Sequence, residues 1–209
     1  MRLRYMNRLV FPASFALFCV GTLSAQEVSH FSFELGAGFT QSVGNTGRYL
    51  NDGWNLQGGA GFNFSPYIGV MGELGYNSLG FNGTTLNTLG YPGGNVNIFS
   101  ATVDPIVHLT PRSRFDLYAI GGGGLYHWSE QFSKPAGLVT TFDSGSFPIV
   151  IPSVGNDYSV NKPGWNAGMG VAFGTKWHGK LFAEARYVHV FLNNGERGDY
   201  VPVTFGFRW

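Results

Sequence analysis

The chain has 209 residues, of which 12% are charged and 16% are aromatic, whereas about 25% of the residues of a soluble domain are usually charged. The formal net charge is +1, from 13 basic and 12 acidic residues, so nothing indicates binding to nucleic acid or to a strongly acidic partner. The 32 glycines follow no triplet repeat and long helix-forming runs are absent, so the composition favours strands and turns.

The segment 1–25 is typical of a secretory signal peptide. Three arginines precede a mostly apolar stretch over 9–21, and small residues then suggest cleavage after Ala25. This stretch is shorter than the roughly 20 apolar residues that a membrane helix needs. The only cysteine, Cys19, lies within it, so we expect residues 26–209 to form one domain without a disulfide.

Apolar and polar residues alternate with period two throughout the mature chain. In the first such stretch Phe33, Leu35 and Phe39 share one face, and Glu34 lies on the other. The alternation predicts eight strands, over residues 31–40, 54–64, 68–77, 99–108, 115–128, 165–174, 181–187 and 201–209. A membrane β-barrel covers such an apolar face with lipid and turns the polar face to its lumen.

The connections between these strands alternate in length. Long polar loops are expected over 41–52, 78–95, 129–163 and 192–199, and short turns over 65–67, 110–114 and 177–180. This order is typical of outer-membrane barrels, which have short periplasmic turns and longer external loops. Eight paired strands would leave no free edge in the hydrocarbon and would bring both termini to the periplasmic side.

Two short runs, 138–142 and 147–151, flank a turn inside the third long loop and predict a hairpin above the membrane. Because a tilted crossing needs about 9–11 residues, ten membrane strands are the less favoured alternative.

The fifth predicted strand contains four consecutive glycines, 121–124, which interrupt its alternation. For this strand we expect Tyr118, Ile120 and Tyr126 to face outward. Aromatic residues near the strand ends are expected to form the interfacial girdles of the barrel. They are Trp54, Phe64, Tyr67, Tyr76, Tyr118, Trp165, Trp177 and Trp209.

Charged residues on the polar faces predict a network inside the lumen. Its expected members are Glu34, Glu73, Asp104, Lys176, Glu184, Arg186 and Arg208. An eight-stranded barrel is just wide enough for side chains to fill, and an isolated buried charge is very costly. We therefore expect these groups to pair and to fix the barrel. A small-solute channel is the alternative, and a bilayer conductance measurement distinguishes the two.

One short cluster, from His127 to Glu130, has catalytic character. His127 and Ser129 share a strand face, as a base and a nucleophile must, and the pair resembles the His-x-Ser of outer-membrane lipid A deacylases. The arginine and asparagine that flank that motif are missing here, and Trp128 near a membrane interface explains the cluster more simply. We expect no catalytic residues. Because the other histidines are dispersed, we also expect no metal site and no cofactor.

Five stretches together resemble the small OmpA/OmpX-like outer-membrane β-barrel superfamily, over nearly the whole mature chain. They are residues 33–39, 66–70, 117–124, 182–187 and 205–209. The resemblance implies an all-β fold, an eight-stranded antiparallel up-and-down transmembrane β-barrel, as a monomer in a bacterial outer membrane.

The resemblance also implies partners and a role. Phe205, Phe207 and Trp209 would serve as the C-terminal signal that the barrel-assembly machinery recognises. The expected function is a structural or surface-interaction role through the external loops, in contact with lipopolysaccharide and outer-membrane lipid. A lipid A-modifying enzyme is the second alternative.

Overall fold

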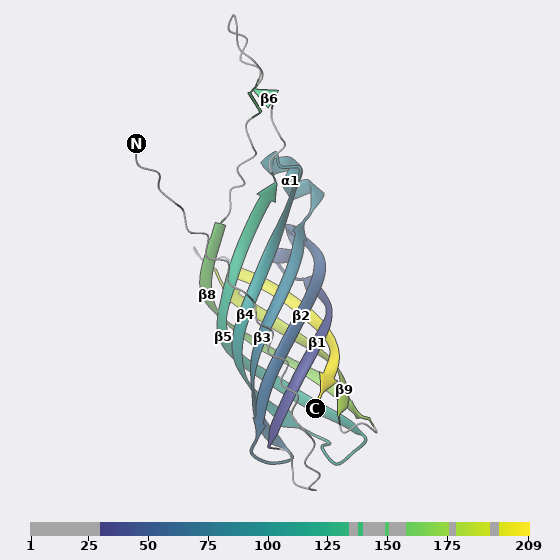
Figure 1. The fold of residues 1–209 in the computed structure, drawn as a ribbon. Coiled ribbons are helices and arrows are strands. Elements are labelled where there is room, and N and C mark those ends of the chain that lie inside the picture. The colour runs from purple at the N-terminus through teal and green to yellow at the C-terminus, as the bar shows by residue number, and fades with distance from the viewer. Residues whose placement is uncertain (1–29, 134–137, 140–148, 151–157, 176–178, 193–196) are drawn as a thin grey trace, which may run out of the picture.

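The computed structural model describes residues 30–133, 138–139, 149–150, 158–175, 179–192 and 197–209, and it shows one closed antiparallel barrel (Figure 1). The barrel strands are β1 (Phe31–Ser42), β2 (Leu50–Asn63), β3 (Ile68–Phe81), β4 (Gly93–His108), β5 (Phe115–Ser133), β8 (Tyr158–Gly174), β9 (Lys180–Phe191) and β10 (Arg197–Arg208). Each pairs with its neighbours in chain order. The predicted eight-stranded up-and-down barrel is confirmed.

The remaining strands, β6 (Leu138–Val139) and β7 (Ile149–Val150), pair only with each other in a separate two-stranded sheet. The alternative of ten membrane strands is therefore wrong. The antiparallel pairing of β6 with β7 agrees with the hairpin predicted over 138–142 and 147–151, whose other residues lie outside the described part of the chain.

The barrel closes between its first and last strands. Their register runs from Glu34 opposite Arg208 to Ser42 opposite Tyr200. Beyond it, Phe33 and Trp209 exchange two backbone hydrogen bonds of 2.9 Å each. Every barrel strand thus has two partners, which is the condition for a sheet to survive in hydrocarbon.

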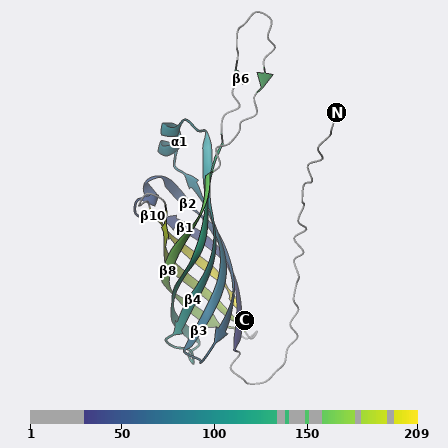
Figure 2. The same cartoon turned by 90° about the vertical axis from the view of Figure 1, so that its left-hand side faces the viewer.

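The two ends of the barrel differ. At one end, the turn end, short connections join β2 to β3, β4 to β5 and β8 to β9. At the other, the loop end, β6 and α1 (Gly83–Leu89) lie beyond the barrel strands, while the C-terminus lies at the turn end (Figures 1 and 2). The alternation of long and short connections predicted this division.

The second long connection is shorter than predicted. The expected loop over 78–95 is replaced by the ends of β3 and β4 and by α1. In these strand extensions Leu79 and Val96 point into the lumen, and both are buried. Asn82 begins α1 by accepting a 2.8 Å hydrogen bond from the Thr85 amide. A 3-10 helix, η1 (Thr46–Arg48), lies in the first long connection.

Among the described residues, no helix is long and apolar enough to span a membrane.

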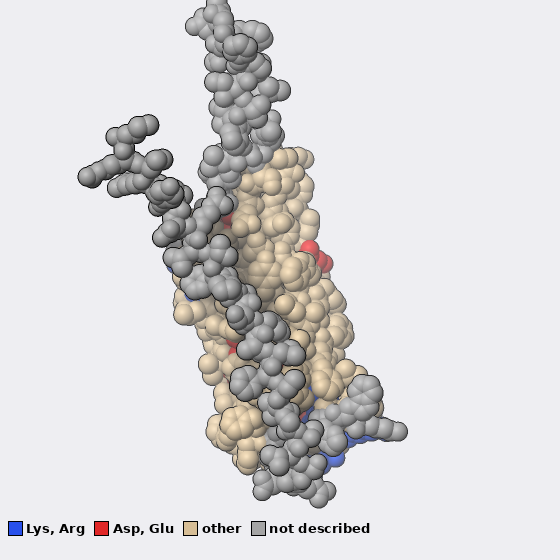
Figure 3. All heavy atoms as spheres, viewed as in Figure 1, with Lys and Arg blue, Asp and Glu red and all other residues tan. Residues whose placement is uncertain are grey.

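The outer wall is apolar and exposed. Leu35, Leu74, Val103, Leu125 and Met169 are each more than half exposed, from five different strands. The face seen in Figure 3 carries few charged atoms on its described part. Soluble monomers rarely expose an apolar surface larger than a few hundred Å². A wall of this kind is typical of the lipid-facing surface of a membrane β-barrel.

The facing of β5 differs from the prediction. Tyr118, Ile120 and Tyr126 point into the lumen and are at most 4% exposed, so Tyr118 does not belong to a girdle. The lumen has space for both tyrosines because each ring lies over a glycine of β8. A Cβ at Gly170 would clash with Tyr118, and one at Gly164 would clash with Tyr126. The lumen of an eight-stranded barrel must be filled by side chains, and this requirement turns these residues inward. The four glycines gave no indication of which face of β5 lies inside.

Most of the other predicted girdle residues that the structure describes are exposed on the outer face, although Trp165 lies in the middle of β8 and not near a strand end. Trp54 packs against Tyr76 with ring centroids 5.3 Å apart, and Trp165 packs against Tyr187 at 5.6 Å. Trp177 and the predicted signal peptide, 1–25, lie outside the described residues.

Candidate functional site

The lumen of the barrel is filled in layers. Along β9 the inward side chains run Phe182, Glu184, Arg186 and Val188, so a charged pair lies between apolar neighbours. The apolar cluster on the turn side consists of Met71, Ile106, Tyr118, Ile120, Ala172 and Phe182. The cluster on the loop side consists of Leu50, Leu79, Val96, Ile98, Tyr126, Trp128, Val188, Val190 and Tyr200. Charged residues are therefore enclosed between two apolar layers.

Arg186 is the centre of the charged layer. Its Nη1 lies 2.6 Å from Glu73 Oε2, and its Nη2 donates a 2.7 Å hydrogen bond to Glu73 Oε1. Nη1 also donates to Asp104 at 3.2 Å, and Nε donates to Glu184. One guanidinium group, only 6% exposed, thus joins carboxylates from three strands, β3, β4 and β9. Such charge-assisted bonds are stronger than neutral ones and compensate for the burial of the charges.

Arg208 forms a second buried ion pair, against the turn-side apolar cluster. Its Nε donates a 2.8 Å hydrogen bond to Glu34 Oε2, across the seam between β10 and β1. Gln57 donates to the other carboxylate oxygen of Glu34 at 3.1 Å. The guanidinium carbon lies 4.8 Å from the Tyr118 ring centroid and 5.2 Å from that of Phe182. The pair fixes the closing seam of the barrel.

A neutral polar layer adjoins the charges on the loop side. Thr40 donates a 2.7 Å hydrogen bond to Asn77, and Thr204 donates a 2.9 Å bond to Asn55. A cavity of about 40 Å³ beside Asn55 is large enough for about one water molecule. We find no space here for a sugar or a peptide.

Of the predicted lumen charges, the structure places Glu34, Glu73, Asp104, Glu184, Arg186 and Arg208 inside the barrel and at most 6% exposed. It brings Glu73, Asp104 and Glu184 together around Arg186, and Glu34 to Arg208. Lys176 lies outside the described residues.

Sequence reasoning missed a third charged group, around Asp116. His108 lies 2.7 Å and Lys180 Nζ 2.9 Å from the same Asp116 oxygen. Asp116 is adjacent to Phe115 and two residues before Tyr118, so its inward direction was hidden by the wrong facing of β5. The alternation of Phe115 and Leu117, both exposed, could have revealed it.

A second polar group lies on the outer face near the loop end, and we name it the polar belt. It consists of Tyr76, Ser78, Asn97, Gln131, His127 and Asn161. Asn97 Oδ1 accepts hydrogen bonds from Tyr76 at 3.0 Å and from Ser78 at 2.9 Å. The belt offers hydroxyl, amide and imidazole groups on the outer wall beside the Trp54 and Tyr76 rings.

The cluster around His127 is divided between the two faces of β5. His127 is on the outer face, where its Nδ1 lies 2.7 Å from Asn161 Oδ1. Glu130 instead accepts a 2.9 Å hydrogen bond from Trp128 Nε1, and Trp128 belongs to the loop-side apolar cluster. An amide, not a carboxylate, therefore orients this imidazole.

The part of the chain that the structure describes contains no group of three or more histidine, cysteine, aspartate or glutamate residues that could hold a metal ion.

The comparisons with known proteins agree with this architecture. The family model of the outer membrane protein β-barrel domain matches residues 12–209. No curated protein matches the chain at a significant level. Neisserial surface protein A (NspA) is a similar solved structure, with a TM-score of 0.56 at 15% identity, over 86% of this chain and 96% of that one. A major outer membrane protein from Thermus thermophilus has a TM-score of 0.57 at 14% identity, over 86% and 97% of the two chains. At these identities the likeness concerns the fold.

Proposed function

Because this chain belongs to the family of outer membrane protein β-barrel domains, we propose that it is a closed barrel of a bacterial outer membrane that acts through its loop end. Its role is that of a structural and surface-interaction protein, without enzymatic activity. The observation that carries this proposal is the closed lumen, in which two apolar layers enclose the ion-pair network of Arg186.

The closed lumen supports a surface role over a channel. A pore needs a continuous polar path, whereas here Tyr118 and Phe182 fill the section on the turn side and Trp128 and Tyr200 fill it on the loop side. Opening such a path would require the separation of buried, paired charges, which is energetically costly.

The described part of the loop end is held by ring contacts and hydrogen bonds. With longer connections outside, as in outer-membrane barrels generally, this end faces away from the cell. The Phe132 ring stacks on Phe81 at 4.6 Å and on Tyr91 at 4.8 Å, which joins β5 to β3 and to the segment after α1. Asn82 ties α1 to the first connection by donating to the Arg48 carbonyl. Loops supported in this way are suited to binding.

Lipopolysaccharide is the partner that the outer surface fits best. The apolar wall suits acyl chains, and the polar belt above it offers hydroxyl and amide groups where phosphates and sugars of a lipid headgroup would lie. Asn97 and Asn161 provide such groups on β4 and β8. The loop end then contacts the sugar chains that extend beyond the headgroup.

We expect the barrel, held in phospholipid nanodiscs, to bind immobilised lipopolysaccharide saturably. A variant with 83–89 replaced by a Gly-Ser linker and 140–148 removed should bind at least about fivefold more weakly, because the removal of part of a binding surface costs roughly 1 kcal/mol or more. Surface plasmon resonance measures the affinity of both proteins.

Arg112→Gln is the matched control, because Arg112 lies in a connection at the turn end, where its Nη1 donates to Tyr67. It should bind as the unmodified barrel does. Equal binding by the unmodified barrel and the loop-end variant, or no binding by either, would rule out a lipopolysaccharide contact through this end.

A further inference from the structure

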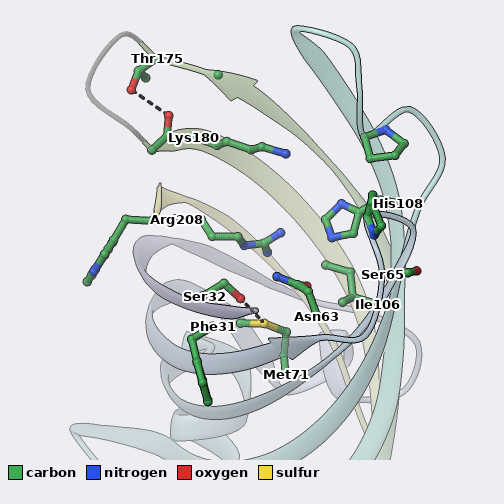
Figure 4. Close-up of a pocket in the computed structure, with 15 residues that line it drawn as sticks. Phe31, Ser32, Asn63, Ser65, Met71, Ile106, His108, Thr175, Lys180 and Arg208 are labelled. Atoms are coloured by element: carbon green, nitrogen blue, oxygen red, sulfur yellow. Dashed lines mark hydrogen bonds between the residues drawn. The ribbon is translucent and has the colours of Figure 1, made fainter. Parts of the chain in front are cut away.

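The barrel has a cavity of about 430 Å³ at its turn end (Figure 4). Met71 and Ile106, both from the turn-side apolar cluster, form its inner wall, and Phe31, Pro66 and Trp209 line it near the turns. This volume is within the range of pockets that bind small molecules, about 300–1,000 Å³. The cavity is separate from the loop-end surface.

The lining of the cavity is basic. His108, Lys180 and Arg208 contribute to it, and among the described lining residues there is no acidic side chain. The carboxylates that pair with these groups, Glu34 and Asp116, lie behind them with side chains that are 0% exposed. The Lys180 side chain, in contrast, is 37% exposed. The side chains that a solute meets in the cavity therefore include basic groups and, among the described lining residues, no acidic one.

Arg208 has unused hydrogen-bonding capacity towards this space. Its Nε and Nη2 both approach one oxygen, Glu34 Oε2, at 2.8 and 2.6 Å. Nη2 is thus occupied by the ion pair with Glu34, whereas Nη1 is buried and, within the described part of the chain, has no acceptor in hydrogen-bond geometry. Figure 4 shows the side chains of Arg208 and Lys180 reaching from one wall towards the wall that carries His108. A buried donor without an acceptor is costly, and an oxygen acceptor in the cavity would satisfy Nη1.

We propose that this cavity binds a small organic anion that combines one carboxylate with an apolar body. The carboxylate accepts hydrogen bonds from Arg208 and Lys180, and the apolar body contacts Met71 and Ile106. A carboxylate matches the fork of a guanidinium group better than a neutral acceptor does. The site goes beyond the surface role proposed above and lies at the opposite end of the barrel.

Two methionines outside the predicted signal peptide provide the readout. Met71 is 1% exposed on the cavity wall, whereas Met169 is 66% exposed on the outer face. In methyl-labelled protein in detergent micelles, phenylacetate should shift the Met71 methyl resonance saturably and leave that of Met169 unchanged. Phenylacetamide, of similar shape but uncharged, should bind at least about tenfold more weakly, because it lacks the charge-assisted bond.

Lys180→Gln should weaken phenylacetate binding about tenfold, while His108 still contacts the Asp116 carboxylate. Arg112→Gln removes the same charge in a turn-end connection without lining the cavity, and it should bind as the unmodified barrel does. For Arg208 the double variant Glu34→Gln with Arg208→Gln avoids an unpaired buried carboxylate, and it should also lose binding.

Three results would overturn the proposal. They are a Met71 resonance that phenylacetate does not move, equal binding of the acid and the amide, and equal losses in Lys180→Gln and Arg112→Gln. The first result would mean that the cavity holds only water. The last would mean that phenylacetate is attracted by the overall positive charge of the turn end and not by Lys180 in the cavity.

Discussion

Replacing Arg186 with leucine is expected to lower the free energy of unfolding of the barrel by about 3–5 kcal/mol, the usual cost of breaking a buried ion pair. The reason is geometric. The change leaves Glu73, Asp104 and Glu184 without the guanidinium group that all three share, in a layer with at most 6% exposure. Urea-induced unfolding in detergent micelles, followed by tryptophan fluorescence, measures the loss.

Two further variants separate this effect from a general loss of charge. Arg112→Leu removes an exposed arginine that contacts Tyr67, and it should cost less than about 1 kcal/mol. Adding Glu73→Gln to Arg186→Leu should recover part of the stability, because one fewer carboxylate is left unpaired. Similar losses for Arg186→Leu and Arg112→Leu would show that the charged layer does not stabilise the barrel.

Replacing Trp209 with alanine is expected to leave most of the protein outside the outer membrane. We propose that Trp209, with Phe205 and Phe207, forms the signal that the barrel-assembly machinery reads. Trp209 also packs against Phe207 at 6.0 Å and against Phe33 at 6.3 Å, and its backbone closes the seam with Phe33. Outer-membrane yield, measured in cells by fractionation, is the readout.

Phe33→Ala is the matched control for this change, because it removes the other member of the same ring contact but lies in β1. If recognition matters, Trp209→Ala should reduce the yield far more than Phe33→Ala does, while Trp209→Phe keeps it. Both alanine variants should still fold in micelles, since the aromatic pair is worth only about 0.5–1.5 kcal/mol. Equal yields of the two alanine variants would mean that packing, and not recognition, is at work.

The alternation of apolar and polar residues was sufficient to predict the strands, because successive residues of a barrel strand face the lipid and the lumen in turn. In β1, Phe33 and Leu35 are exposed and Glu34 is buried, as the pattern requires. It failed in β5, where Gly121–Gly124 carry no side chains that could indicate a face. The consequence was that Tyr118 was placed outside and Asp116 was missed.

The partners of the charges could not be predicted from the sequence. Arg186 and Glu73 are 113 positions apart and meet across the lumen, which depends on the register of several strands. The helix α1 was missed for a local reason, since its cap at Asn82 is followed by only seven helical residues. The basic character of the turn-end cavity arises because Glu34 and Asp116 are buried behind their basic partners. The spacing of residues in the sequence does not indicate this arrangement.

The central claim, that the lumen is closed, is tested most directly by single-channel conductance of the unmodified barrel in planar bilayers. The two apolar layers on either side of the Arg186 network predict no discrete conductance steps above the bare bilayer in symmetric salt. Large, reproducible steps from the unmodified protein would contradict the closed lumen and would favour a small-solute channel.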